Sequence, residues 1–102
     1  MSSRPALIVI ASAKAKPGKA KELEKALRDV AEPTRLQHGS VSWALYRSSR
    51  DPMLYVAVER WASRPDHDKH LRGDHVKHLM AVLGTVLAEP PSIVEYEIVL
   101  EK

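Results

Sequence analysis

A carboxylate and two aromatic side chains recur at alternate positions of one short segment. Tyr55, Glu59 and Trp61 share one face of an expected strand over residues 53–61, because successive side chains of a strand point to opposite faces. The other face is aliphatic and carries Leu54, Val56 and Val58. We expect the aliphatic face to pack on helices and the mixed face to line a pocket, where aromatic walls hold a flat phenol and Glu59 accepts its proton. Apolar walls should raise the pKa of Glu59. The alternative roles are an interface salt bridge for Glu59 and a core plug for Trp61.

Histidines gather just after this segment. Four fall within twelve residues: His67, His70, His75 and His78. With neighbouring aspartates they have the residue types of a zinc site, but Gly73 separates the two pairs and His78 lies opposite the apolar stripe of its helix. We therefore predict no metal site. His70 and His75 are the expected pocket histidines, and a neutral imidazole near Glu59 would suit proton transfer.

Hydrophobic periodicity predicts the elements that must position these side chains. Strands are expected over residues 6–13, 41–48, 53–61 and 93–100, and helices over 20–34, from 63 to about 72, and from 74 to 87. Pro33 should kink the end of the first helix, and Ser63 should cap the second. The order βαββαβ indicates an α+β, ferredoxin-like fold whose two helical segments cover one face of a four-stranded antiparallel sheet. We expect a disordered N-terminus over residues 1–5 and a single domain over 6–102.

Composition excludes several classes of function. The chain has 102 residues, which suits one globular domain, and no cysteine, which removes disulfides, thiolate metal sites and cysteine nucleophiles. Its net charge of +3 comes from 16 basic residues interleaved with 13 acidic ones, so no nucleic-acid partner is expected. Apolar stretches fall far short of the roughly 20 residues that span a bilayer, so we expect no membrane contact and a cytoplasmic location. Phosphate-loop, nucleophile-elbow and dinucleotide motifs are missing from the sequence.

The expected strands are apolar on both faces, which leaves one face of the sheet uncovered by the helices. A second copy packed sheet to sheet about a two-fold axis would cover it. The sequence therefore predicts a homodimer with a barrel-like interior that has room for a ligand. Trp61 should lie against the pocket, and Trp43 should report on the dimer interior.

Short motifs follow one another along nearly the whole chain: Lys16-Pro17-Gly18, Glu32-Pro33-Thr34-Arg35, Gly39, Asp51-Pro52, Glu59-Arg60-Trp61, His70 and Asp74-His75. In this order and spacing they resemble the antibiotic biosynthesis monooxygenase family, including its small quinol monooxygenase-like members. The resemblance implies a dimeric α+β barrel that oxidises a small aromatic molecule, such as a quinol, phenol or anthrone, with O2 and no cofactor. The site residues assigned with it are Glu59, His70 and His75 as catalytic groups and Trp61, Tyr55, Trp43 and Tyr46 as substrate contacts.

One departure from the family concerns asparagine. Several relatives use an Asn to stabilise the deprotonated substrate, and this chain contains none. Its substitute is left open among Ser12, Ser42, Tyr46 and Arg60. Haem degradation, which uses an Asn, Trp and His set in the family, is disfavoured. The alternatives are a non-enzymatic small-molecule-binding module, or an isomerase or decarboxylase on the same fold. RNA binding is disfavoured because the third strand lacks the Gly- and Phe-containing motif of RNA-binding sheets.

Overall fold

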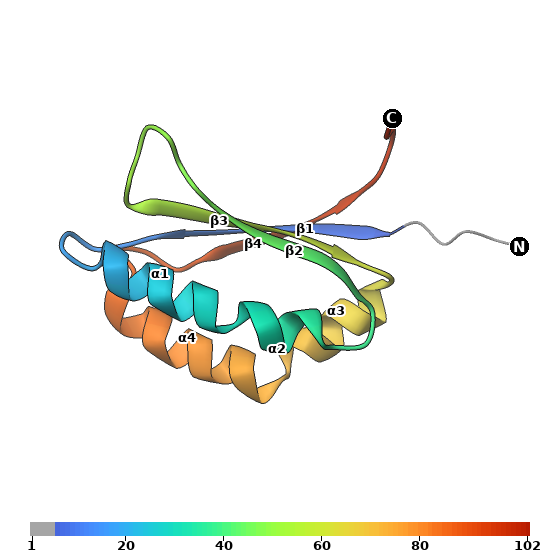
Figure 1. The fold of residues 1–102 in the computed structure, drawn as a ribbon, viewed down its shortest axis with the longest axis horizontal. Coiled ribbons are helices and arrows are strands. Elements are labelled where there is room, and N and C mark those ends of the chain that lie inside the picture. Colours follow the sequence, from blue (N-terminus) through green and yellow to red (C-terminus); the bar gives the residue numbers. More distant parts are fainter. Residues whose placement is uncertain (1–5) are drawn as a thin grey trace, which may run out of the picture.

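The computed structural model describes residues 6–102, so the N-terminal residues 1–5, expected to be disordered, lie outside the described part. Its strands are β1 (Leu7–Lys14), β2 (Ser40–Arg47), β3 (Leu54–Trp61) and β4 (Ser92–Glu97), and its helices are α1 (Ala20–Asp29), α2 (Ala31–Arg35), α3 (Arg64–Leu71) and α4 (Asp74–Val86). The strands form one antiparallel sheet in the order β2-β3-β1-β4, and the helices lie along one face of it (Figure 1). This confirms the predicted α+β, ferredoxin-like fold.

The two faces of β3 are oriented opposite to our prediction. Tyr55, Glu59 and Trp61 are buried beneath the helices, whereas Leu54, Val56 and Val58 are half-buried on the face that the helices leave open. The polar atoms of the mixed face explain this orientation, because buried polar groups need hydrogen-bond partners. The helix layer supplies one to Tyr55, whose hydroxyl donates to Glu24 Oε1 at 2.9 Å. Aliphatic side chains need no such partner, so they tolerate the open face.

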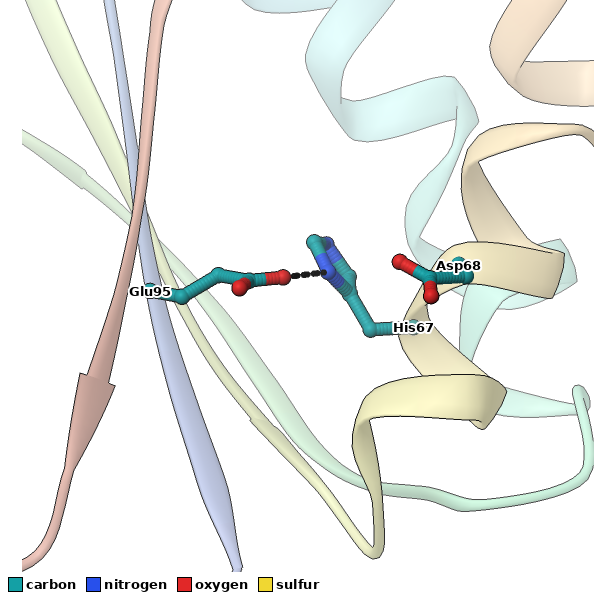
Figure 2. Close-up of side chains that lie close together, drawn as sticks. All are labelled: His67, Asp68 and Glu95. Atoms are coloured by element: carbon teal, nitrogen blue, oxygen red, sulfur yellow. Dashed lines mark hydrogen bonds and ion pairs between the residues drawn. The ribbon is translucent and has the colours of Figure 1, made fainter.

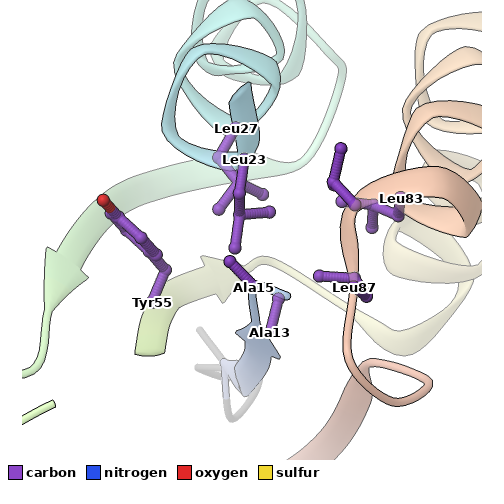
Figure 3. Close-up of a cluster of buried hydrophobic side chains, with 8 residues drawn as sticks. Ala13, Ala15, Leu23, Leu27, Tyr55, Leu83 and Leu87 are labelled. Atoms are coloured by element: carbon purple, nitrogen blue, oxygen red, sulfur yellow. The ribbon is translucent and has the colours of Figure 1, made fainter. Parts of the chain in front are cut away.

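The core lies between the sheet and helices α1 and α4. Figure 3 shows leucines of both helices closing over the ends of β1 and β3. The buried members are Ala13, Ala15, Leu23, Leu27, Tyr55, Leu83, Val86 and Leu87. A second, smaller cluster joins Leu7, Val9 and Trp61 at the other end of the sheet. Small side chains on β1 let the helices approach the sheet, while the larger residues fix their positions.

The predicted kink of the first helix is confirmed. The helix ends at Asp29 and resumes at Ala31, so that α1 and α2 are separate segments around Val30. Pro33 has no N–H and its ring clashes with the carbonyl four residues earlier, which is that of Asp29. After α2 the chain turns at Gly39, whose φ of 85° lies in the left-handed region that favours glycine. This turn directs the chain from α2 into β2.

Two further expectations concern the second half of the chain. Ser63 caps α3 as predicted, since its side chain accepts a hydrogen bond from the backbone N–H of Asp66 at 3.2 Å. The last strand is shorter than the predicted 93–100, because β4 ends at Glu97. Glu97 pairs with Leu7, the first residue of β1, so later residues have no β1 partner. Within residues 6–102 no helix has the length and apolar character needed to cross a membrane.

Candidate functional site

A cavity lies between the helix layer and the sheet, inside a single chain. Its volume is about 70 Å³, which is below the roughly 300–1,000 Å³ typical of small-molecule sites. The lining is mainly apolar, and its polar side chains are Trp43, Thr34, Tyr55, Glu59, His67 and His70. No lysine or arginine lines it among the described residues. The mixed face of β3 therefore lines a cavity beneath the helices and does not face the open side of the sheet, where the dimer interior was predicted.

Glu59 is the buried carboxylate of this cavity. Its residue is 6% exposed, and its Oε1 accepts a hydrogen bond from Trp61 Nε1 at 2.9 Å. Burial raises the pKa of Glu59, although the Trp61 hydrogen bond and the charge of His67 act in the opposite direction. The predicted rise in pKa is confirmed. None of the ion pairs within residues 6–102 involves Glu59, and its alternative role as an interface salt-bridge partner stays a prediction.

Trp61 hydrogen-bonds to Glu59 but does not itself line the cavity. It is almost completely buried, with its ring centroid 4.7 Å from that of His70 and 5.8 Å from that of His67. The prediction that Trp61 lies against the pocket is therefore wrong. The indole fills the space at the end of the sheet and fixes one oxygen of Glu59, which makes it a positioning residue.

Two histidines of α3 reach the cavity. His67 and His70 are one turn apart on the helix and both are buried. His67 Nδ1 lies 3.1 Å from Glu95 Oε2, and His70 Nδ1 lies 2.5 Å from Gln37 Oε1. Burial lowers the pKa of His70 to about 4, and the charges of His67 and His75 add to this effect. His70 is therefore a neutral imidazole at pH 7.

His75, the other histidine expected in the pocket, does not line the cavity. Its Nε2 lies 3.3 Å from Thr34 Oγ1, and its ring is 5.5 Å from that of His70. With His78 it borders an outer groove between α1 and α4. The helix turns Val76 toward the cavity instead. His67 takes the place expected for His75, and its three-residue spacing from His70 is the signal by which the sequence pairs them on one helix face.

The remaining aromatic candidates divide between the two faces of the sheet. Tyr55 and Trp43 both line the cavity. Trp43 pairs with Glu59 in the strand register, so it shares the helix face and does not report on a dimer interior as predicted. Tyr46 pairs with Val56 on the open face and is 58% exposed, so it does not line this cavity.

The candidates for the missing asparagine are separated in the same way. Ser12 is the one of the four that borders the cavity, and its pairing with Val56 places its side chain on the open face. Ser42 and Arg60 pair with each other on the open face with Tyr46, and Arg60 forms an ion pair with Glu101. Thr34, which the sequence analysis did not single out, is fully buried and lines the cavity. The hydroxyl of Thr34, which also lies 3.3 Å from His75 Nε2, is therefore the one at the described cavity wall that can hydrogen-bond a ligand oxygen.

His67, Asp68 and Glu95 form a cluster at the edge of the cavity (Figure 2). One potential ligand atom from each lies within 4.8 Å of the others, and an imidazole with two carboxylates has the ligand types of a divalent ion site. Both oxygens of Glu95 are already engaged, because Arg64 binds Oε1 and His67 binds Oε2. A cation would have to replace these two contacts.

Comparison with known proteins is consistent with this architecture. The family model described as antibiotic biosynthesis monooxygenase matches residues 6–82. A curated relative, an uncharacterized protein of Synechocystis sp., is 25% identical over 92 residues, which are 90% of this chain and 63% of the relative. This chain thus spans less than two thirds of the length of that relative.

Solved structures share the fold over almost the whole chain. A protein of Pseudomonas aeruginosa superposes with a TM-score of 0.90 at 23% identity, covering 98% of this chain and 100% of its own. A protein of Mycobacterium tuberculosis gives a TM-score of 0.88 at 28% identity, covering 94% and 97%. A solved antibiotic biosynthesis monooxygenase gives 0.86 at 24% identity, covering 92% and 99%. With the family model matching about three quarters of its length, this chain belongs to the antibiotic biosynthesis monooxygenase family.

Proposed function

We propose that this protein is a cofactor-independent monooxygenase that oxidises a small hydroxylated aromatic molecule with O2. The observation that carries the proposal is Glu59, a buried carboxylate with a raised pKa on the wall of a mainly apolar cavity. Such a group is suited to general-base chemistry near neutral pH. The family and its monooxygenase-named structural relatives support the same reaction class.

The first step of this reaction is removal of a proton from the substrate. Glu59 accepts the proton of an aromatic hydroxyl, so that an O–H bond breaks and an electron-rich phenolate forms. Thr34 donates a hydrogen bond to the phenolate oxygen. The phenolate then supplies the electrons that O2 accepts. For a quinol, one oxygen atom enters the ring and the other leaves as water, and the hydroxyquinone formed accounts for all the electrons transferred.

The lining also bears on the class of substrate. Because no cation lines the described cavity, a substrate carboxylate or phosphate would enter it unpaired, at a high desolvation cost. A neutral ring with hydroxyl groups meets no such cost. Trp43 and Tyr55 provide aromatic surface against which such a ring packs.

Oxygen uptake by the purified protein with a panel of hydroquinones, anthrones and simple phenols, in the presence of a chelator, tests this function. We expect uptake of one O2 per substrate molecule and no hydrogen peroxide. Ligand binding without oxygen uptake would support the small-molecule-binding alternative. Substrate loss at an unchanged oxygen level would support an isomerase or decarboxylase.

We also propose that two chains pair through the open face of the sheet. Large apolar side chains remain exposed on this face, among them Tyr46, Val94 and Tyr96 at 58%, 41% and 47%. A second copy would remove this surface from water, as the hydrophobic effect favours. Sedimentation at micromolar concentration should show a dimer, and Val94→Asp should shift it toward the 11.4 kDa monomer. A wild-type protein that sediments only as the monomer would contradict the pairing.

A further inference from the structure

The mouth of the cavity is marked by apolar side chains that line it and yet remain exposed. Leu71 at the end of α3, Met80 on α4 and Ile93 on β4 all border the cavity, and between 37% and 43% of each residue is exposed. Helix α4 packs against α1 and α3 rather than against β4. The cavity therefore opens at this edge of the molecule, between α4 and β4.

A groove continues from this mouth between the last turns of α4 and the Pro90-Pro91 segment that precedes β4. We call it the outer groove. Its volume is about 410 Å³, against about 70 Å³ for the cavity. Met80, Leu83 and Pro91 line both spaces, so the outer groove and the cavity meet at these three side chains. A ligand could therefore occupy both spaces at once.

The lining of the outer groove is apolar apart from one acidic residue, Glu89. Within residues 6–102, no lysine, arginine or histidine contributes to it. An anionic group would be repelled here and would lose its water without gaining a partner, whereas an alkyl chain gains free energy by leaving water. The outer groove therefore suits an uncharged, apolar group.

Gly84 keeps the outer groove open. It borders the groove and lies within α4, although glycine is the least favourable residue in a helix after proline. A Cβ added at this position would meet no atom within 4 Å, so space remains where a side chain would stand. A group supplied by a ligand can take up this space.

We propose that the outer groove binds an apolar substituent of the substrate while the hydroxylated ring occupies the cavity. The inference rests on the proposed function, because it concerns the substrate of the same cavity. A cavity of about 70 Å³ leaves little room for a substituent beside the ring, so such a group must pass between Met80 and Pro91 into the outer groove. The substrate class is thereby narrowed to hydroxylated aromatic rings that carry a short alkyl chain or a similar uncharged group.

Calorimetric titration in the absence of oxygen tests this assignment, with hydroquinone and its methyl, propyl and pentyl derivatives as ligands. In the wild type, we expect the affinity to rise by up to about fourfold for each methylene that enters the outer groove. Gly84→Phe places a ring in the groove, so this variant should bind hydroquinone like the wild type but show no gain along the series. Thr85→Phe adds the same ring at the neighbouring position, which is exposed and lines neither space, and should keep the full gain.

Ala88→Phe fills the outer groove from the segment after α4 and carries the same expectation if Gly84→Phe does not fold. Absence of a gain in the wild type, or an equal gain in a folded groove variant, would overturn the assignment. The titration consumes no oxygen, so it separates failure of this inference from failure of the proposed function. A flat series would reject the groove even if the protein oxidises hydroquinone. A rising series that the groove variants abolish would support it even without oxygen uptake.

Discussion

Replacement of Glu59 by glutamine tests its role in catalysis separately from its effect on the free energy of unfolding. Glutamine keeps the volume of the side chain and an Oε1 that accepts the Trp61 Nε1–H bond, which is 2.9 Å long. It removes the ability to accept a proton. We therefore expect the cavity and its ligand affinity to survive and turnover to be lost.

The size of both effects follows from the burial of Glu59. General-base catalysis contributes about 10²–10⁴ in rate, equivalent to about 3–5 kcal/mol of transition-state stabilisation. Folding raises the pKa of Glu59 above its usual 4.5, so the ionised side chain lowers the free energy of unfolding at neutral pH. That cost is about 1.4 kcal/mol for each pH unit of the rise, and it disappears as the pH falls below 4.5. Glu59→Gln should therefore stabilise the fold at pH 7 more than at pH 4.

Three assays on the same two proteins check this expectation: oxygen uptake, ligand affinity by tryptophan fluorescence, and thermal unfolding at both pH values. Each kcal/mol gained corresponds to roughly 4–8 °C in Tm for a small domain. The reasoning is refuted if Glu59→Gln turns over within a few-fold of wild type. It is equally refuted if the variant melts below wild type at pH 7, because Glu59 would then be a stabilising charge.

Three further outcomes are expected. Folding lowers the pKa of His70 from 6.5 to about 4. The free energy of unfolding, measured with urea, should therefore be highest above pH 6.5 and fall by up to ~3 kcal/mol as the pH drops to 4. The part of this loss that comes from His70 should be absent in His70→Gln. Gly39→Ala should cost more than Gly18→Ala, for which ~1–2 kcal/mol is expected, because both glycines have positive φ but an added Cβ meets a side chain only at Gly39; equal urea midpoints would contradict this. An aromatic ligand should quench the fluorescence of Trp61→Phe, which retains Trp43 on the cavity wall, and leave Trp43→Phe nearly unchanged. The opposite pattern would place the ligand elsewhere.

The fold was predictable because its signals are local. Pro33 requires a break in the first helix, Ser63 caps α3, and alternation on β3 groups Tyr55 with Glu59 and Trp61. Alternation does not state which group faces the helices. Both faces of this sheet are apolar enough to be covered, and the choice depends on partners such as Glu24 that lie far away in the sequence.

The site was less predictable because its contacts join residues that lie far apart in the sequence. A helical wheel places His67 and His70 on one face, but the burial of His67 depends on Glu95, which is 28 residues later and on another element. His75 has a plausible place on its own helix, and its contact with Thr34 spans 41 residues. Side chains whose environment comes from a distant segment carry little local signal of their role.

The position of the cavity on the helix side of the sheet has a consequence for the kinetics of the proposed dimer. The cavity lies beneath the helices, whereas the proposed pairing uses the opposite, open face of the sheet. Neither protomer would contribute residues to the cavity of its partner. The rate of each protomer would therefore depend on substrate concentration independently, with a Hill coefficient of about one. Heterodimers that pair a wild-type chain with a Glu59→Gln chain should retain half of the activity per dimer. Activity should then decline in direct proportion to the fraction of inactive chains mixed in.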